Sequence, residues 1–110
     1  MIEIRRYAKS NGKVPVDDWL KKLRDNKIRL RIQQRLRRVS LGNLGDYKFV
    51  REGIFELTLD FGSGYRIYFS KIEQTIILLL CGGDKDTQNQ DIEKAVEYLK
   101  DYENRTSFPQ

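Results

Sequence analysis

The chain has 110 residues, with 21 Lys or Arg against 16 Asp or Glu, so its formal net charge is +5. Hydrophobic residues make up 39% of it and aromatic residues 11%, a composition that favours one globular domain and excludes a disordered protein. The longest apolar run, residues 76–81, is far too short to cross a bilayer. The cationic excess favours a polyanionic partner, nucleic acid or an acidic protein, over the plainer role of keeping the surface soluble.

The cysteine and histidine content limits the chemistry. The one cysteine, Cys81, lies in an apolar run, so we expect no disulfide framework and a reducing, cytoplasmic location. Histidine is absent, which removes the commonest general base and argues against a zinc site. The alternating start at Ile2 and Ile4 predicts no signal peptide. We therefore expect no metal, no other cofactor and no membrane association.

The first part of the chain predicts a strand followed by a helix. Alternation over residues 2–7 favours the strand, which Ser10-Asn11-Gly12 ends. Pro15 suits the first position of a helix. The apolar face of this helix repeats at intervals of three and four residues: Val16, Trp19, Leu20 and Leu23.

A second helix follows, and the two predict a helical hairpin. Asp25 and Asn26 can cap it, and Gly42 is a natural stop. Arginines occupy much of its circumference outside one apolar line: Ile28, Ile32, Leu36 and Val39.

From Asp46 onward the apolar period drops to two, which predicts strands over residues 47–50, 54–61 and 65–70. The last two match best through a three-residue loop, Gly62-Ser63-Gly64. This register pairs Leu59 with Ile67 and opposes Asp60 to Arg66.

The final part predicts a buried strand and a helix. Residues 75–80 are apolar without alternation, as in a strand covered on both faces. A capping box at Thr87–Gln90 would begin a helix whose inner face is Ile92, Ala95, Val96 and Leu99. The order β-α-α-β-β-β-β-α predicts an α+β fold, a twisted and mainly antiparallel sheet with an N-terminal helical hairpin and a C-terminal helix. We expect one domain over residues 1–103 and a frayed tail over residues 104–110.

Three segments are candidates for binding nucleic acid. The polar face of the 54–61 and 65–70 hairpin carries Arg and Tyr, which contact phosphates and stack on bases, although a solvated face with an Asp60–Arg66 ion pair fits as well. Gly82-Gly83-Asp84-Lys85 would place N–H groups and a lysine at a helix start, yet a tight turn needs the same glycines. The arginine-rich helix would give sequence-blind phosphate contacts or only a solvated face.

Two long strings carry a family resemblance. "GIFELTLDFGSGYRIYF", residues 53–69, and "ILLLCGGDKDTQNQDIEKAVEY", residues 77–98, resemble the HigB-like killer proteins of addiction modules, which belong to the RelE/ParE superfamily and are often found in phages and plasmids. "VDDWLKKL", residues 16–23, resembles their first helix, so the match covers nearly the whole chain. The resemblance implies a twisted sheet that cradles RNA against two N-terminal helices.

The resemblance also implies a function: the toxin of a type II toxin–antitoxin pair, a metal-independent endoribonuclease that cleaves mRNA on the ribosome. The RNA 2′-hydroxyl attacks the adjacent phosphate, which Arg66 would stabilise with Lys85 as a second cationic contact. Glu56 and Tyr68 are the candidates for the general base. The expected RNA-binding residues are Arg35, Arg38, Tyr65 and Gln88. The implied partners are mRNA, the ribosome and a helix-turn-helix antitoxin, which would form a heterotetramer with the toxin.

Two departures from the family pattern leave other functions open. Thr58 stands where relatives commonly have a basic residue, and the chain has no C-terminal histidine. The alternatives are a ParE-like inhibitor of DNA gyrase and a catalytically inactive nucleic-acid-binding partner that regulates transcription with its antitoxin. A gyrase inhibitor would need no phosphate-site arginine, so dependence of toxicity on Arg66 separates it from the nuclease.

Overall fold

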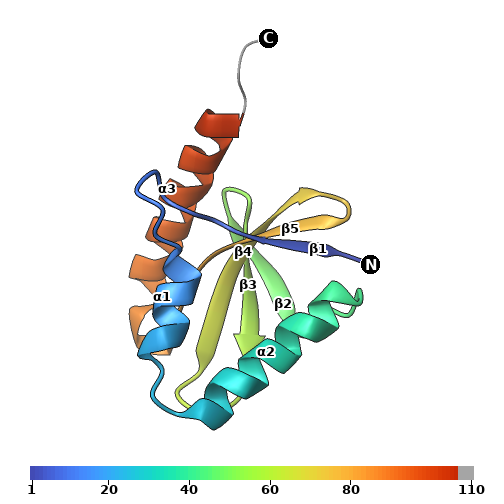
Figure 1. Ribbon diagram of the computed structural model, residues 1–110, viewed down its shortest axis with the longest axis vertical. Helices are drawn as coiled ribbons and strands as arrows, with labels where there is room; N and C mark the ends of the chain where they lie inside the picture. Colours follow the sequence, from blue (N-terminus) through green and yellow to red (C-terminus); the bar gives the residue numbers. More distant parts are fainter. Residues whose placement is uncertain (107–110) are drawn as a thin grey trace.

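Helices cover both faces of a five-stranded sheet in the computed structural model, which describes residues 1–106 (Figure 1). Helices α1 and α2 pack on one face of this sheet, and α3 packs on the other. The elements in chain order are β1 (Glu3–Arg6), α1 (Pro15–Lys22), α2 (Asn26–Ser40), β2 (Tyr47–Arg51), β3 (Ile54–Leu59), β4 (Tyr65–Glu73), β5 (Ile76–Gly83), the short 3-10 helix η1 (Lys85–Thr87) and α3 (Gln88–Thr106).

The sheet has the strand order β1-β5-β4-β3-β2. Strands β2 to β5 pair antiparallel with their neighbours, and β1 joins β5 in parallel, which confirms an α+β protein with a mainly antiparallel sheet and a C-terminal helix. Residues 77–80 of β5 are buried on both faces, as their unbroken apolar run predicted.

The register of β3 and β4 corrects the expected hairpin. Leu57 lies opposite Ile67 and Leu59 lies opposite Tyr65, so the loop spans residues 60–64 and the expected three-residue loop is wrong. The error is a shift of two residues, which leaves every side chain on the face where it was expected. Alternation alone cannot detect such a shift, because it fixes the face of a residue and not its partner.

The same shift gives Arg66 a different neighbour. It lies opposite Thr58, while Asp60 is exposed in the loop, so the expected Asp60–Arg66 ion pair is absent from residues 1–106. The guanidinium pairs instead with Glu56 on β3.

Local sequence signals set the limits of α1 and α2. Pro15 is the first residue of α1, and Asp25 caps α2 by accepting a hydrogen bond from the backbone N–H of Lys27 at 2.9 Å. The inward side chains of both helices join the sheet in one buried cluster, where each contributes about 1.5–3 kcal/mol through burial. These residues are Val16, Leu20, Ile32, Leu36 and Val39.

The C-terminal helix begins at Gln88, as the expected capping box from Thr87 implied, and it ends later than expected. The capping box in the structure lies one turn earlier, at η1: the Asp84 carboxylate accepts the backbone N–H of Asp86 at 2.9 Å, and Thr87 completes the box. The expected inner face of α3 is buried as predicted. Residues 104–106 are helical, not frayed, and residues 107–110 lie outside the described part of the chain. No helix within residues 1–106 is long and apolar enough to span a membrane.

Candidate nucleic-acid interface

Two rows of side chains cross the face of the sheet on which α3 packs. The first row is Thr58, Arg66 and Gly83, and the second is Lys48, Glu56, Tyr68 and Cys81. The N-terminal end of α3 lies beside these rows, since Gln88 bonds Glu56 and Asp91 lies against Gly83. Lys48, at the edge of the second row, is exposed.

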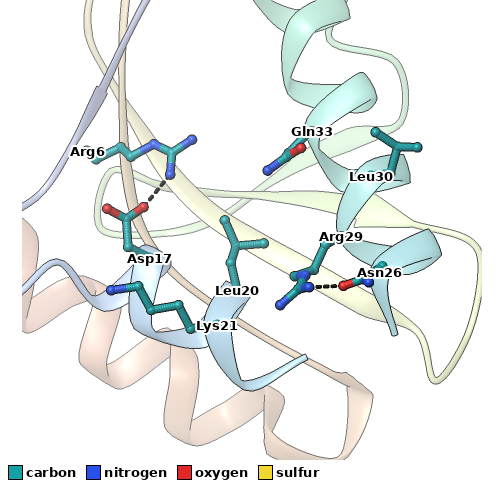
Figure 2. A pocket seen from close by; sticks show the side chains of 8 residues that line it. All are labelled: Arg6, Asp17, Leu20, Lys21, Asn26, Arg29, Leu30 and Gln33. Carbon is teal, nitrogen blue, oxygen red and sulfur yellow. Dashed lines mark hydrogen bonds and ion pairs between the residues drawn. The ribbon is translucent and has the colours of Figure 1, made fainter. Parts of the chain in front are cut away.

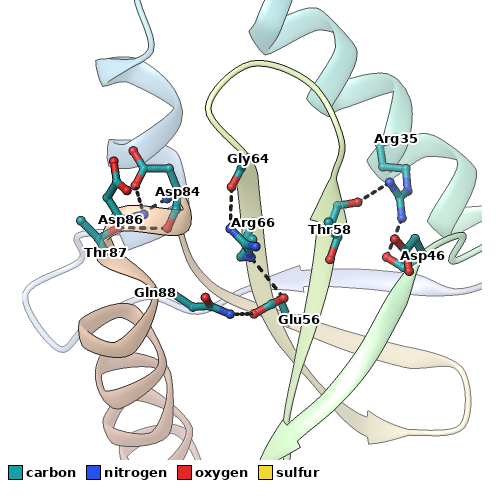
Figure 3. A network of polar contacts seen from close by, with 10 residues as sticks. All are labelled: Arg35, Asp46, Glu56, Thr58, Gly64, Arg66, Asp84, Asp86, Thr87 and Gln88. Atoms are coloured by element: carbon teal, nitrogen blue, oxygen red, sulfur yellow. Dashed lines mark hydrogen bonds and ion pairs between the residues drawn. The ribbon is translucent and has the colours of Figure 1, made fainter.

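The Arg66 side chain, in the middle of the first row, is fixed at two points. Its Nε donates to Glu56 Oε1 at 3.2 Å, and its Nη1 donates to the carbonyl oxygen of Gly64 at 2.9 Å (Figure 3). The side chain is still 19% exposed. Within residues 1–106, Nη2 has no protein acceptor, so part of the guanidinium fork faces outward.

Glu56 lies beneath Arg66 and is closed off from solvent. Its side chain is 1% exposed, and its second oxygen, Oε2, accepts a hydrogen bond from Gln88 Nε2 at 2.8 Å. The carboxylate therefore joins β3, β4 and the first residue of α3 in one network (Figure 3).

Lys85 reaches the same site from η1. A Cβ added at Gly64 would lie 3.5 Å from Arg66 Nη1 and 3.5 Å from Lys85 Cβ, so the lysine stem and the guanidinium flank this glycine together. Gly64 has a φ of +75°, which glycine adopts readily, and both side chains lie within ordinary van der Waals contact of its added Cβ. Lys85 is exposed, which leaves its ammonium free to meet an anion.

The two glycines before this site are required by close packing and not by a turn, because both belong to β5. A Cβ at Gly82 would meet the ring of Trp19, and a Cβ at Gly83 would meet the carboxyl group of Asp91. The expected phosphate seat of free N–H groups is already filled in part, since Asp84 itself caps the backbone here. What the GGDK segment adds to the site is the lysine.

Tyr68 is placed away from any substrate. Its ring is 0% exposed, and burial, followed by the charge of Glu56, raises the pKa of its hydroxyl well above the ordinary value. A group that neither reaches the surface nor ionises near neutrality cannot act as a general base, so this expectation is corrected. The same burial closes Glu56 to direct contact with RNA.

The remaining expected RNA-binding residues do not gather at this site. Arg35 donates to the backbone carbonyls of Asp46 and Thr58 (Figure 3) and to that of Leu44, at 2.8 to 3.0 Å. It thereby holds α2 against the β2–β3 edge. Burial lowers the pKa of Arg35, as expected of a guanidinium in a structural role. Arg38 is exposed on the same helix.

Tyr65 lies on the other face of the sheet from Arg66. It packs edge-on against Trp19 with 6.1 Å between ring centroids, and the buried cluster under α1 and α2 holds both rings. Of the expected site residues, the structure therefore brings together Arg66, Glu56, Gln88 and Lys85. Lys48 was missed, because only the pairing of β2 with β3 places it beside Glu56.

A separate groove lies between α1 and α2 (Figure 2). It encloses about 620 Å³, and none of the expected site residues lines it. Its polar rim includes the Arg6–Asp17 ion pair, Lys21 and Arg29, and exposed Leu30 lies on one wall. Residues 1–106 hold no cluster of three or more His, Cys, Asp or Glu that could bind a metal.

The fold and this site define a small α+β protein with a basic site where β4, η1 and α3 meet. No protein-family model matches the chain. The chain is 47% identical over 79 residues to an uncharacterized protein of Haemophilus influenzae, an alignment that covers 72% of the chain and 80% of the relative. The chain belongs to the same family as this Haemophilus protein.

Proposed function

We propose that the protein is the toxin of a type II toxin–antitoxin pair, a cytoplasmic, metal-independent endoribonuclease that cleaves mRNA on the ribosome. The observation that carries the proposal is the pairing of Arg66 with Lys85 around Gly64. One cation has its guanidinium fixed by Glu56 and Gly64, and the other is exposed. The net charge of +5 favours approach to a polyanion.

The two cations suit a phosphate that gains charge during reaction. In the proposed step the 2′-oxygen attacks the adjacent phosphorus, the bond from phosphorus to the 5′-oxygen breaks, and a cyclic phosphate forms. The 2′-hydroxyl loses its proton to water, and the 5′-oxygen takes one from water. Arg66 would bind two phosphate oxygens through its fork, and Lys85 would add a point charge to the same group.

The site provides charge and orientation, and neither residue that was expected as its base can act as one. Glu56 and Tyr68 are buried, and the chain has no histidine, so none of them can take the 2′-proton. This favours an enzyme that relies on in-line geometry imposed by the ribosome, because orientation alone can supply much of the barrier reduction. Lys48, on the same face of the sheet, would supply the phosphate contact that Thr58 does not.

The test compares Arg66→Lys with Arg51→Lys in single-turnover cleavage of mRNA on programmed ribosomes. Arg66→Lys keeps the charge that Glu56 needs but loses the fork, so cleavage should fall by about tenfold to a hundredfold. Arg51 forms an exposed pair with Glu52, so its variant should cleave within about twofold of the wild type. Both should melt within a few degrees of wild type. Full cleavage by folded Arg66→Lys and Arg66→Ala proteins would remove Arg66 from the site.

The positive charge of the Arg66–Lys85 site also favours an acidic protein partner. We propose that a helix-turn-helix antitoxin covers the Arg66–Lys85 site with an acidic segment, within a toxin–antitoxin heterotetramer. Adding purified antitoxin should abolish cleavage. Unchanged cleavage in the complex would contradict the inhibition, and inhibition of gyrase supercoiling with intact mRNA would identify the rival activity.

A further inference from the structure

Glu56 is far more buried than every other acidic residue that forms an ion pair with an arginine or lysine in the described residues. In the other ion pairs of residues 1–106, both side chains are at least 37% exposed, whereas Glu56 is 1% exposed. Exposed pairs hold their side chains weakly, because water screens the charges. A buried carboxylate is costly without a partner, so it constrains its arginine far more strongly.

We propose that Glu56 and Gln88 are positioning residues that hold the guanidinium of Arg66 in a ligand-ready orientation, and that Glu56 acts only through Arg66. The inference rests on the proposed function, because it assigns roles within the same site. It replaces the expectation that Glu56 is a general base and that Gln88 binds RNA.

The hydrogen bonds define how the positioning works. Gln88 Nε2 holds Oε2 of Glu56 at 2.8 Å, which turns Oε1 toward Arg66 Nε at 3.2 Å. Gly64 holds Nη1 at 2.9 Å on the other side of the guanidinium. Two bonds to one planar group fix its plane, so the N–H groups of Nη2 point in a set direction. The arginine then gives up little side-chain freedom when an oxyanion binds.

Glu56 cannot serve as the base in this geometry. Each of its two oxygens already accepts a hydrogen bond, one from Arg66 and one from Gln88. A base must approach the 2′-hydroxyl within about 3.2 Å, which a carboxylate beneath Arg66 and 1% exposed does not do. Glu56 can therefore influence the reaction only by holding Arg66.

The first experiment is a double-mutant cycle between Glu56→Gln and Arg66→Lys, read by single-turnover cleavage across pH. Glu56→Gln keeps the shape of the side chain, and Gln88 can rotate its amide to bond it. We expect cleavage to fall about tenfold in the wild-type background and by less than about twofold in Arg66→Lys, with an unchanged pH profile. Gln88→Leu should also reduce cleavage more in the wild-type background than in Arg66→Lys, and its loss of cleavage should be smaller than that of Glu56→Gln. Glu52→Gln, at an exposed pair, is the matched control and should have no effect.

The second experiment follows Arg66 without any substrate. In ¹⁵N NMR spectra, the Nε–H of Arg66 should give an ordered, slowly exchanging signal that Glu56→Gln and Gln88→Leu both weaken, whereas Glu52→Gln leaves it unchanged. Binding of an RNA hexamer with one 2′-deoxy position should weaken in parallel. Should Glu56→Gln fail to fold, Gln88→Leu and the wild-type signal still decide the question.

The outcomes separate the two proposals. A mobile Arg66 in the wild type would overturn the positioning role whatever the activity. Equal losses from Glu56→Gln in both backgrounds, with a changed pH profile, would make Glu56 a base and overturn it as well. An ordered Arg66 in a protein that neither cleaves nor binds RNA would instead overturn the proposed nuclease and leave the positioning role standing.

Discussion

Replacing Gly83 with alanine tests how closely α3 approaches the sheet. A Cβ at this position would lie 2.7 Å from the carboxyl carbon of Asp91 and 2.9 Å from Thr87 Oγ1, and closer still to Asp91 Oδ2. Atoms repel at these separations, so the Asp91 side chain would have to leave its place. Its departure would break the 2.6 Å hydrogen bond that Thr87 donates to it.

Two contributions set the size of the expected loss of stability. Overpacking of this kind costs about 1–3 kcal/mol, and losing a hydrogen bond to a buried carboxylate costs about 1–3 kcal/mol. We therefore expect Gly83→Ala to lower the free energy of unfolding by about 2–6 kcal/mol. Gly83 does not have a positive φ, so backbone strain adds nothing to this figure.

Urea denaturation measures the loss, with Gly12→Ala as the control. Gly12 has a φ of +88° and nothing within 4 Å of its added Cβ, so only the backbone cost of about 1–2 kcal/mol applies. Adding Asp91→Ala to Gly83→Ala should restore part of the stability, because the carboxyl group no longer occupies the site of the new methyl group. A loss below about 0.5 kcal/mol for Gly83→Ala, or no restoration in the double variant, would refute the close approach.

Three further predictions concern the core. Leu59 is 0% exposed, so Leu59→Ala should cost about 2–5 kcal/mol in urea melts, and a loss below about 0.5 kcal/mol would contradict its burial. Burial, with a hydrogen bond to Asp101, raises the pKa of Tyr7 to about 12. The neutral Tyr7 therefore stabilises the folded protein fully below the unfolded pKa of about 10, and this stabilisation is lost as the pH rises toward the folded pKa. Tyr7→Phe should therefore flatten the alkaline fall in stability by up to about 1.4 kcal/mol per pH unit, and parallel curves would count against it. Burial raises the pKa of Cys81 to about 12, so at pH 8 the native thiol should react with a disulfide reagent about a thousandfold more slowly than a free cysteine; rapid labelling of the folded protein would show an open thiol.

Local patterns determined the elements of this protein. Pro15 and Asp25 mark where α1 and α2 begin, and the apolar spacing of α3 identifies its buried face, because caps and helical periodicity act over a few residues. The unbroken apolar run of β5 likewise predicted a strand buried on both faces. Arg66 and Lys85 could be singled out from the motifs around them.

Tertiary contacts decided what the polar residues do. Alternation placed Glu56 and Tyr68 on a polar face, but α3 packs on that face and buries both, so a surface expected to meet solvent became a core that encloses the Glu56 carboxylate. Arg35, one of many arginines in its helix, became structural because the carbonyls of Leu44, Asp46 and Thr58 converge on it. Such partners lie far apart in the sequence. The register of β3 and β4 is undetermined for a similar reason, because the alternating pattern of a strand looks the same after a shift of two residues. Only the packing of the whole chain determines which partners and which register form.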